Sequence, residues 1–108
     1  MRVLHVDNVD WILKVHKALL DVPGLELVSC RTLKGAKRAL DEEGLEFDII
    51  LIDGYIYMTQ DGLQWAQKLS TQGRKVIVLV SFRGSGQDIP FLDKRMFDPE
   101  ALQQLIRE

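Results

Sequence analysis

The sequence lacks several features on which secreted and membrane proteins depend. Cys30 is its only cysteine, which excludes an intrachain disulfide and a thiolate metal cluster. No segment approaches the roughly twenty apolar residues that a membrane-spanning helix needs. The first residues, interrupted by His5, Asp7 and Asn8, are unlike a signal peptide. These absences predict a cytoplasmic protein with no membrane segment.

The chain also has no concentration of charge of one sign. Its 14 Lys and Arg residues stand against 16 Asp and Glu residues, for a net charge of −2 at pH 7. The basic residues are scattered along the sequence, whereas a nucleic-acid-binding surface needs them clustered. We therefore expect no direct contact with nucleic acid. The 108 residues, 46% of them apolar, are enough for one core, so we expect a single domain over residues 1–108.

Two short apolar runs predict the middle of a parallel sheet. Residues 49–53 contain one polar side chain, Asp53, and residues 75–81 are apolar from Val76 to Val80. Runs of this length, rich in β-branched residues, are typical of strands buried on both faces. Shorter strands are expected at residues 3–6, 25–30 and 90–94. Together they predict a five-stranded sheet.

Amphipathic helices are expected between these strands, which makes the fold class α/β. The predicted helix starts are Asp10, Thr32, Asp61-Gly62 and Asp98-Pro99-Glu100, and the predicted ends are Pro23-Gly24, Gly44 and Gly73. The face of the first helix expected to be buried consists of Trp11, Ile12, Val15, Ala18 and Leu19. Before the third helix we expect an irregular loop at 54–60. The connection at residues 82–89 is shorter than a parallel crossover normally needs, so we predict no regular helix there, or a single turn.

Polar residues follow the predicted strands. Asp7 and Asn8 follow the first, Asp53 ends the third, and Ser81 and Lys94 end the fourth and fifth. In a doubly wound sheet of strand order 2-1-3-4-5 these ends meet at one crevice. Carboxylate and amide oxygens suit Mg²⁺, and a hydroxyl and an ammonium group suit phosphoryl oxygens. A central carboxylate can act as the nucleophile that accepts the phosphoryl group.

These motifs, in this order, resemble the receiver domain of two-component response regulators from Val3 to about Leu105. Residues 4–8 resemble the first strand with its acidic pair, and residues 48–53 resemble the third strand with the phosphoacceptor aspartate. Asp61-Gly62 resembles the start of the third helix of the family. Positions that match the switch hydroxyl, the aromatic residue that changes rotamer and the invariant lysine are Ser81, Phe91 and Lys94.

The resemblance implies a flavodoxin-like doubly wound sheet of five parallel strands, order 2-1-3-4-5, with the fourth helix of the family missing or reduced to a loop. It implies Mg²⁺-dependent transfer of phosphate to Asp53 from a histidine kinase or a phosphotransfer protein, followed by slow loss to water. At most this is autophosphorylation and autodephosphorylation rather than the activity of a dedicated enzyme. The residues implied to hold the metal are Asp7, Asn8, Asp53 and, through its carbonyl, Tyr55. Ser81 and Lys94 would contact the phosphoryl oxygens, and Ser81 and Phe91 would act as the switch.

Departures from the family pattern support an alternative. Asn8 stands where a second acid is usual, Phe82 where a small residue is usual, and the fourth helix is expected to be absent. A degenerate pseudo-receiver, acting as a phosphorylation-independent protein-interaction module, would fit these departures. A metal-dependent phosphohydrolase is less well supported, because no residue is placed as a dedicated general acid or base. Without the fourth helix, we expect a homodimer or partner protein at the side of the fourth and fifth strands, at Phe82, Ile89 and Phe91.

Each candidate residue also has a purely structural interpretation. Asp53 could cap the turn after its strand, and Asn8 could satisfy the backbone at a turn. Ser81 and Lys94 could simply end their strands at the surface. For His5 and His16 we favour structural roles, with His5 packed on its strand and His16 on a solvated helix face beside lysines.

Overall fold

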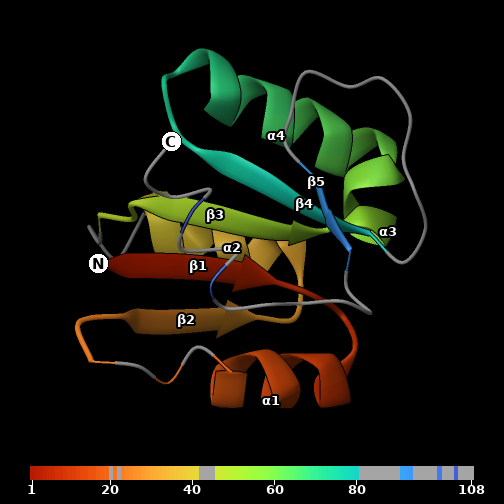
Figure 1. The fold of residues 1–108 in the computed structure, drawn as a ribbon. Coiled ribbons are helices and arrows are strands. Elements are labelled where there is room, and N and C mark those ends of the chain that lie inside the picture. Colours follow the sequence, from red (N-terminus) through yellow and green to blue (C-terminus); the bar gives the residue numbers. More distant parts are fainter. Residues whose placement is uncertain are drawn as a thin grey trace.

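A five-stranded parallel sheet runs through the protein (Figure 1). The computed structural model describes residues 1–19, 21, 23–41, 46–80, 91–93, 100 and 104, without the side chains of residues 19, 80 and 91–93. In chain order the elements are β1 (Arg2–Val6), α1 (Asp10–Leu19), β2 (Glu26–Cys30), α2 (Leu33–Asp41), β3 (Ile49–Asp53), α3 (Gly54–Met58), α4 (Gln60–Thr71), β4 (Val76–Val80) and β5 (Phe91–Asp93).

The strand order confirms the predicted topology. The sheet runs β2-β1-β3-β4-β5, and each neighbouring pair is parallel. In this register Val6 lies opposite Ile52, and Asp53 lies opposite Leu79. The sheet therefore reverses its winding between β1 and β3, the place where open α/β sheets collect ligands. The predicted connection at 82–89 and most of the predicted last helix lie outside the described residues.

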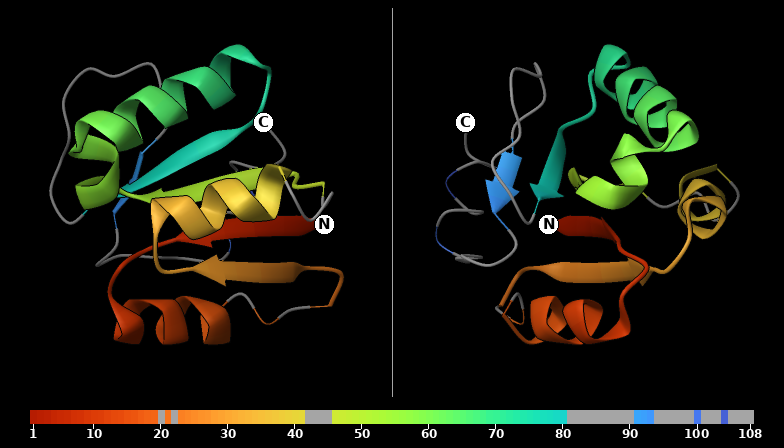
Figure 2. Two further views of the ribbon diagram at one scale, coloured as in Figure 1. Left: turned by 180° about the vertical axis from the view of Figure 1, so that it is seen from behind. Right: turned by 90° about the vertical axis from the view of Figure 1, so that its right-hand side faces the viewer.

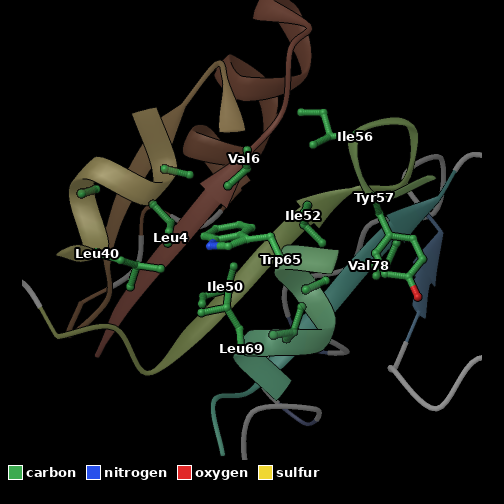
Figure 3. Packing of buried hydrophobic residues seen from close by; sticks show 14 residues of the cluster. Leu4, Val6, Leu40, Ile50, Ile52, Ile56, Tyr57, Trp65, Leu69 and Val78 are labelled. Carbon is green, nitrogen blue, oxygen red and sulfur yellow. The ribbon is translucent and has the colours of Figure 1, made fainter. Parts of the chain in front are cut away.

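Helices α2 and α4 cover one face of the sheet. Successive side chains of a strand point to opposite faces, and on this face Leu4, Val6, Ile50 and Ile52 pack with Trp65 of α4 (Figure 3). The right-hand view of Figure 2 shows α2 and α4 on the same side of the strands. Strand residues on the opposite face form a second buried cluster: Val3, Ile49, Leu51, Ile77 and Leu79. The central strands are therefore buried on both faces, as their apolar runs predict.

Helix α1 packs on that second face, but with a different side from the one we predict. Trp11 is 66% exposed, and Val15 and Ala18 are also exposed, whereas Ile12, Leu13 and His16 are buried. The predicted solvated position of His16 is therefore wrong as well. Its Nδ1 lies 3.1 Å from Nε2 of His5 on β1, which is a hydrogen-bond distance between two buried imidazoles. This contact sets the rotation of α1 on the sheet.

The irregular loop that we predict at 54–60 is wrong, because helix α3 and the start of α4 occupy these residues. Two side-chain caps hold the two helix starts. Asp53 Oδ1 accepts a hydrogen bond from the Tyr55 N–H at 3.2 Å and caps α3. Thr59 Oγ1 accepts from the Gly62 N–H at 3.1 Å and caps α4, which begins one residue before the predicted start. Helix α3 also buries Ile56 and Tyr57 against the core. Caps and burial together stabilise a helix that is too short to show a helical period in its sequence.

Gly62 is required by the sharp corner between α3 and α4. A Cβ atom at this position would lie 1.7 Å from the carbonyl oxygen of Ile56 and 2.6 Å from its carbonyl carbon. Both atoms belong to the backbone, so a side-chain rotation cannot relieve the clash. The corner can form only if residue 62 has no side chain.

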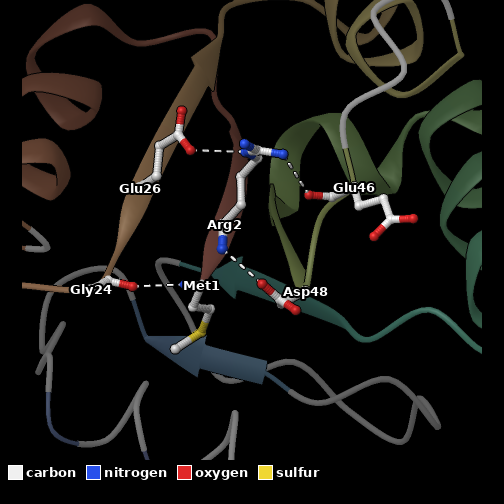
Figure 4. A network of polar contacts seen from close by, with 6 residues as sticks. All are labelled: Met1, Arg2, Gly24, Glu26, Glu46 and Asp48. Atoms are coloured by element: carbon white, nitrogen blue, oxygen red, sulfur yellow. Dashed lines mark hydrogen bonds and ion pairs between the residues drawn. The ribbon is translucent and has the colours of Figure 1, made fainter.

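Side chains cross-link the amino ends of the strands (Figure 4). The Arg2 backbone N–H donates to Asp48 Oδ2 at 2.8 Å, and its guanidinium donates to the Glu46 carbonyl oxygen at 3.2 Å. Arg2 Nε also pairs with Glu26 Oε2 at 2.9 Å. One residue of β1 thus joins β2 to the segment that enters β3.

We expect Gly62→Ala to lower the free energy of unfolding by roughly 2 kcal/mol or more, because the clash outweighs the higher helix propensity of alanine. Urea unfolding followed by circular dichroism measures the change. Gly35→Ala in α2 is the control, since the nearest atom to its Cβ is a side-chain oxygen at 3.2 Å. Equal stability of the Gly62 variant and the wild-type protein would refute the close-approach argument.

Burial raises the pKa of the Tyr57 phenol above its ordinary value of 10.0. Because the unfolded chain loses this proton at lower pH than the folded one, Tyr57 should make stability fall as pH rises above about 10. The measurement is the urea midpoint as a function of pH. Tyr57→Phe should reduce the alkaline loss, while Tyr55→Phe, at an exposed position, should leave it unchanged. Equal behaviour of the two variants would contradict the role of burial.

Candidate functional site

Two buried carboxylates lie next to each other at the carboxyl ends of β1 and β3. Val6 pairs with Ile52, so the residues that follow, Asp7 and Asp53, come side by side on strands about 4.8 Å apart. Asp7 is 0% exposed and Asp53 is 2% exposed. Two acidic side chains buried at one point of the sheet are costly. This pair is therefore the strongest candidate for a functional centre in the described part of the chain.

Asp7 is held by a tight turn between β1 and α1. Its Oδ1 accepts a hydrogen bond from the Val9 N–H at 3.0 Å, the local arrangement that aspartate favours at turns. Its backbone N–H donates to the Cys30 carbonyl oxygen at 3.1 Å, which extends the pairing with β2. The carboxylate is thus fixed by its own loop and by the neighbouring strand.

Asp53 has the capping role that the structural interpretation predicts, because its Oδ1 binds the Tyr55 N–H. This role and the phosphoacceptor role are compatible, since a carboxylate has two oxygens and several acceptor positions. The cap fixes the side chain at the end of β3. The sequence predicts that Asp53 lies at the centre of the site, and the last pair of the β1–β3 register, Val6 with Ile52, places Asp53 next to Asp7.

The remaining predicted metal ligands differ in their surroundings. Asn8 is exposed, and the Tyr55 side chain is 72% exposed on α3. Carbonyl groups of an α-helix point toward its C-terminal end, so coordination by the Tyr55 carbonyl would require the first turn of α3 to open. In the described ranges, no group of three or more His, Cys, Asp or Glu side chains is arranged to hold a metal. The two carboxylates nonetheless are hard oxygen donors of the kind that Mg²⁺ prefers.

Two predicted site residues are not placed by the structure, and of a third only the backbone is described. Ser81 and Lys94 lie outside the described residues, and so do the predicted contact residues Phe82 and Ile89. Phe91 begins β5 opposite Val78, but its side chain lies outside the described part. The roles of these residues in phosphate binding, switching and association therefore stay predictions.

The buried imidazole pair is the feature near this site that sequence reasoning missed. His5 lies two residues before Asp7, on the same face of β1, and its ring centroid is 4.8 Å from that of His16. The sequence does indicate that His16 is buried. His16 follows Ile12 and Leu13 at spacings of four and three, so it shares a helix face with them.

Solved structures with the same architecture are receiver domains. The N-terminal domain of a response regulator/sensory box/GGDEF three-domain protein from Carboxydothermus hydrogenoformans has a TM-score of 0.75 and 18% identity, over 99% of this chain and 91% of that one. The receiver domain of response regulator 1452 from Francisella has a TM-score of 0.73 and 21% identity, over 98% of this chain and 96% of that one. This chain has the receiver-domain fold.

A third structure gives the same result. The response regulator receiver domain from Clostridium thermocellum has a TM-score of 0.73 and 21% identity, over 98% of this chain and 90% of that one. No protein-family model and no curated protein matches the sequence. The likeness therefore lies in the fold. Among the described residues, no helix is both long and apolar enough to cross a membrane.

We expect His16→Ala to lower the free energy of unfolding by roughly 2–3 kcal/mol, because it removes a buried ring and its hydrogen bond to His5. Chemical unfolding measures the change. Lys17→Ala, at the exposed neighbouring position of the same helix, controls for the effect of alanine on α1. If the two variants are equally stable, the imidazole contact does not hold α1 on the sheet.

Proposed function

We propose that this chain is a phosphoacceptor receiver domain in two-component phosphorelay signalling. In this proposal Asp53 takes a phosphoryl group from a histidine kinase or a phosphotransfer protein, with Mg²⁺ bound. The observation that carries the proposal is the register of β1 and β3, which brings Asp7 and Asp53 together as buried carboxylates at the switch point of the sheet. The receiver fold of similar structures supports the same assignment.

The electrostatics of the pair favour a bound cation. Two negative charges on neighbouring strands repel each other, and burial weakens the screening by water that would reduce this repulsion. A divalent cation held between the carboxylates would offset the repulsion. When bound, Mg²⁺ would also neutralise charge on the incoming phosphoryl oxygens.

The proposed reaction is a displacement at phosphorus. A carboxylate oxygen of Asp53 forms the new P–O bond as the P–N bond of the donor phosphohistidine breaks, and the electron pair returns to the imidazole nitrogen. The product is an acyl phosphate on Asp53, which water later hydrolyses. Asp7 would hold the cation, and Ser81 and Lys94 would contact the phosphoryl oxygens.

A pseudo-receiver is the second candidate, favoured by two observations at the proposed metal site. Asn8 supplies an amide where a further carboxylate would add negative charge, and the Tyr55 carbonyl belongs to the first turn of α3. Both reduce the number of ligands available to a cation without rearrangement. Such a protein would act through a phosphorylation-independent interface. For either candidate we propose a cytoplasmic location and a homodimer or partner contact at the β4–β5 side.

Incubation with Mg²⁺ and acetyl phosphate should add one phosphoryl group to the wild-type protein, as measured by intact mass. Asp53→Asn should abolish the added mass. Asp61→Asn, which changes an exposed carboxylate on α4, should retain it and thereby show that the modification is specific to the buried site. Asn8→Asp should lower the Mg²⁺ concentration needed for half-maximal phosphorylation, because it restores a negative charge.

The phosphoacceptor proposal fails if the folded protein gains no mass and also fails to bind beryllofluoride, a stable analogue of the phosphoryl group. That result would favour the pseudo-receiver. Equal labelling of the Asp53 variant and the wild-type protein would instead place the phosphate on another residue.

A further inference from the structure

A cavity of about 300 Å³ lies between α2 and α4, on the face of the sheet opposite α1. Its floor is formed by three buried apolar side chains: Leu40, Trp65 and Leu69. Figure 3 shows the indole of Trp65 reaching from α4 toward Leu40 of α2. A second cavity of about 380 Å³ adjoins it along α2 and shares Lys37, Asp41 and Asp61 with it. Neither cavity includes Asp7 or Asp53.

Positive side chains gather around these two cavities. Five cations line them, against the two carboxylates of Asp41 and Asp61: Lys34, Lys37, Arg38, Lys68 and Arg74. The chain as a whole has a net charge of −2, so this region is opposite in sign to the average of the protein. The cations come from α2, from α4 and from the turn after α4, which explains why they are scattered along the sequence and meet only in the fold.

The cations of the first cavity outnumber its carboxylates, with Lys37, Lys68 and Arg74 against Asp41 and Asp61. The ion pairs seen in the described residues join Arg2 to Glu26 and Arg31 to Asp10. Lys37, Lys68 and Arg74 take part in neither of them. A concave surface on which positive charges outnumber negative ones attracts anionic ligands and raises their local concentration.

One of the two carboxylates, Asp61, lies away from the cations at the C-terminal end of α4. Asp61 is in the first turn of α4 and Lys68 is in its last turn, which separates them by about 10 Å along the helix axis. Gln72 and Arg74 follow immediately after Lys68. An anion held between Lys68 and Arg74 would lie far from Asp61, and these two cations would offset the partial negative charge of the helix C-terminus.

We propose that this cavity binds a phosphorylated small molecule of the nucleoside diphosphate class. Lys68 and Arg74 would bind the phosphates, because an ammonium and a guanidinium group are the usual partners of phosphate oxygens. Gln64 and Gln72 would donate to the uncharged part, above the apolar floor. The volume falls at the lower end of the range of small-ligand sites, about 300–1,000 Å³. The site is concave and has a buried indole at its base. This shape suits a small phosphorylated ligand better than it suits an acidic protein, which would present a flat surface.

Tryptophan emission provides a direct test, because Trp65 lines the cavity and Trp11, the second tryptophan, is exposed on α1. In a Trp11→Phe background, pyrophosphate and ADP should each change the Trp65 emission in a saturable way, and added salt should weaken both. Adenosine should have little effect. Tighter binding of ADP than of pyrophosphate would show that the uncharged part is recognised. The buffer contains a chelator and no phosphodonor, so the result does not depend on phosphorylation of Asp53.

Removal of the charges of Lys68 and Arg74 should show whether ADP binds at this site or is only attracted by the positive charge of the protein. Lys68→Gln with Arg74→Gln should weaken ADP binding at least about tenfold, the loss expected when two charged contacts to phosphate are removed. Lys14→Gln with Lys17→Gln removes the same charge from exposed positions of α1 and should leave binding unchanged. Thermal unfolding checks that both variants are folded.

Three results would overturn the proposal. The first is the absence of saturable binding by ADP and pyrophosphate. The second is equal loss of binding in the two double variants, which would indicate only long-range attraction. The third is tight binding of polyglutamate without binding of ADP, which would identify the region as a surface for an acidic protein.

Discussion

The fold depends on the burial of β3 on both of its faces. Every residue of this strand is buried, from Ile49 through Asp53. Such a strand needs neighbours on both edges to satisfy its backbone and layers on both faces to cover its side chains. At its edges these needs are met by β1 and β4, and on one face by α2 and α4. On the other face its side chains pack in a cluster with Val3, Ile77 and Leu79. The position of Asp53 follows from the same constraint, because it is the last residue of this buried strand. The register of β1 and β3 then places Asp7 next to it.

The parts of the fold that sequence reasoning predicted correctly are those governed by long-range burial. The apolar runs 49–53 and 76–80 predict the centre of a parallel sheet, and β3 and β4 are confirmed as neighbours inside the order β2-β1-β3-β4-β5. The parts predicted wrongly depend on single contacts. Helix α3 forms because Asp53 and Thr59 cap its two ends, which no periodic pattern indicates. The orientation of α1 follows from His16, a polar residue that a simple apolar pattern assigns to solvent.

The candidate site divides in the same way. Its two carboxylates could be predicted because Asp53 ends a strand whose burial is clear from the sequence and Asp7 directly follows another strand. The cationic cavity could not be predicted, because Lys37 and Lys68 become neighbours only when α2 and α4 pack on the same face. Sequence distance carries no information about such a cluster. Charge that looks evenly distributed along a chain can therefore be strongly uneven on the surface of the fold.

The cross-links of Arg2 have a mechanical consequence for the sheet. They tie β1 to β2 and to the segment entering β3 at the amino ends of the strands, while the carboxylate pair lies at the opposite ends. These cross-links lie at the opposite ends of the strands from Asp7 and Asp53, so a rearrangement at the carboxyl ends would leave them in place.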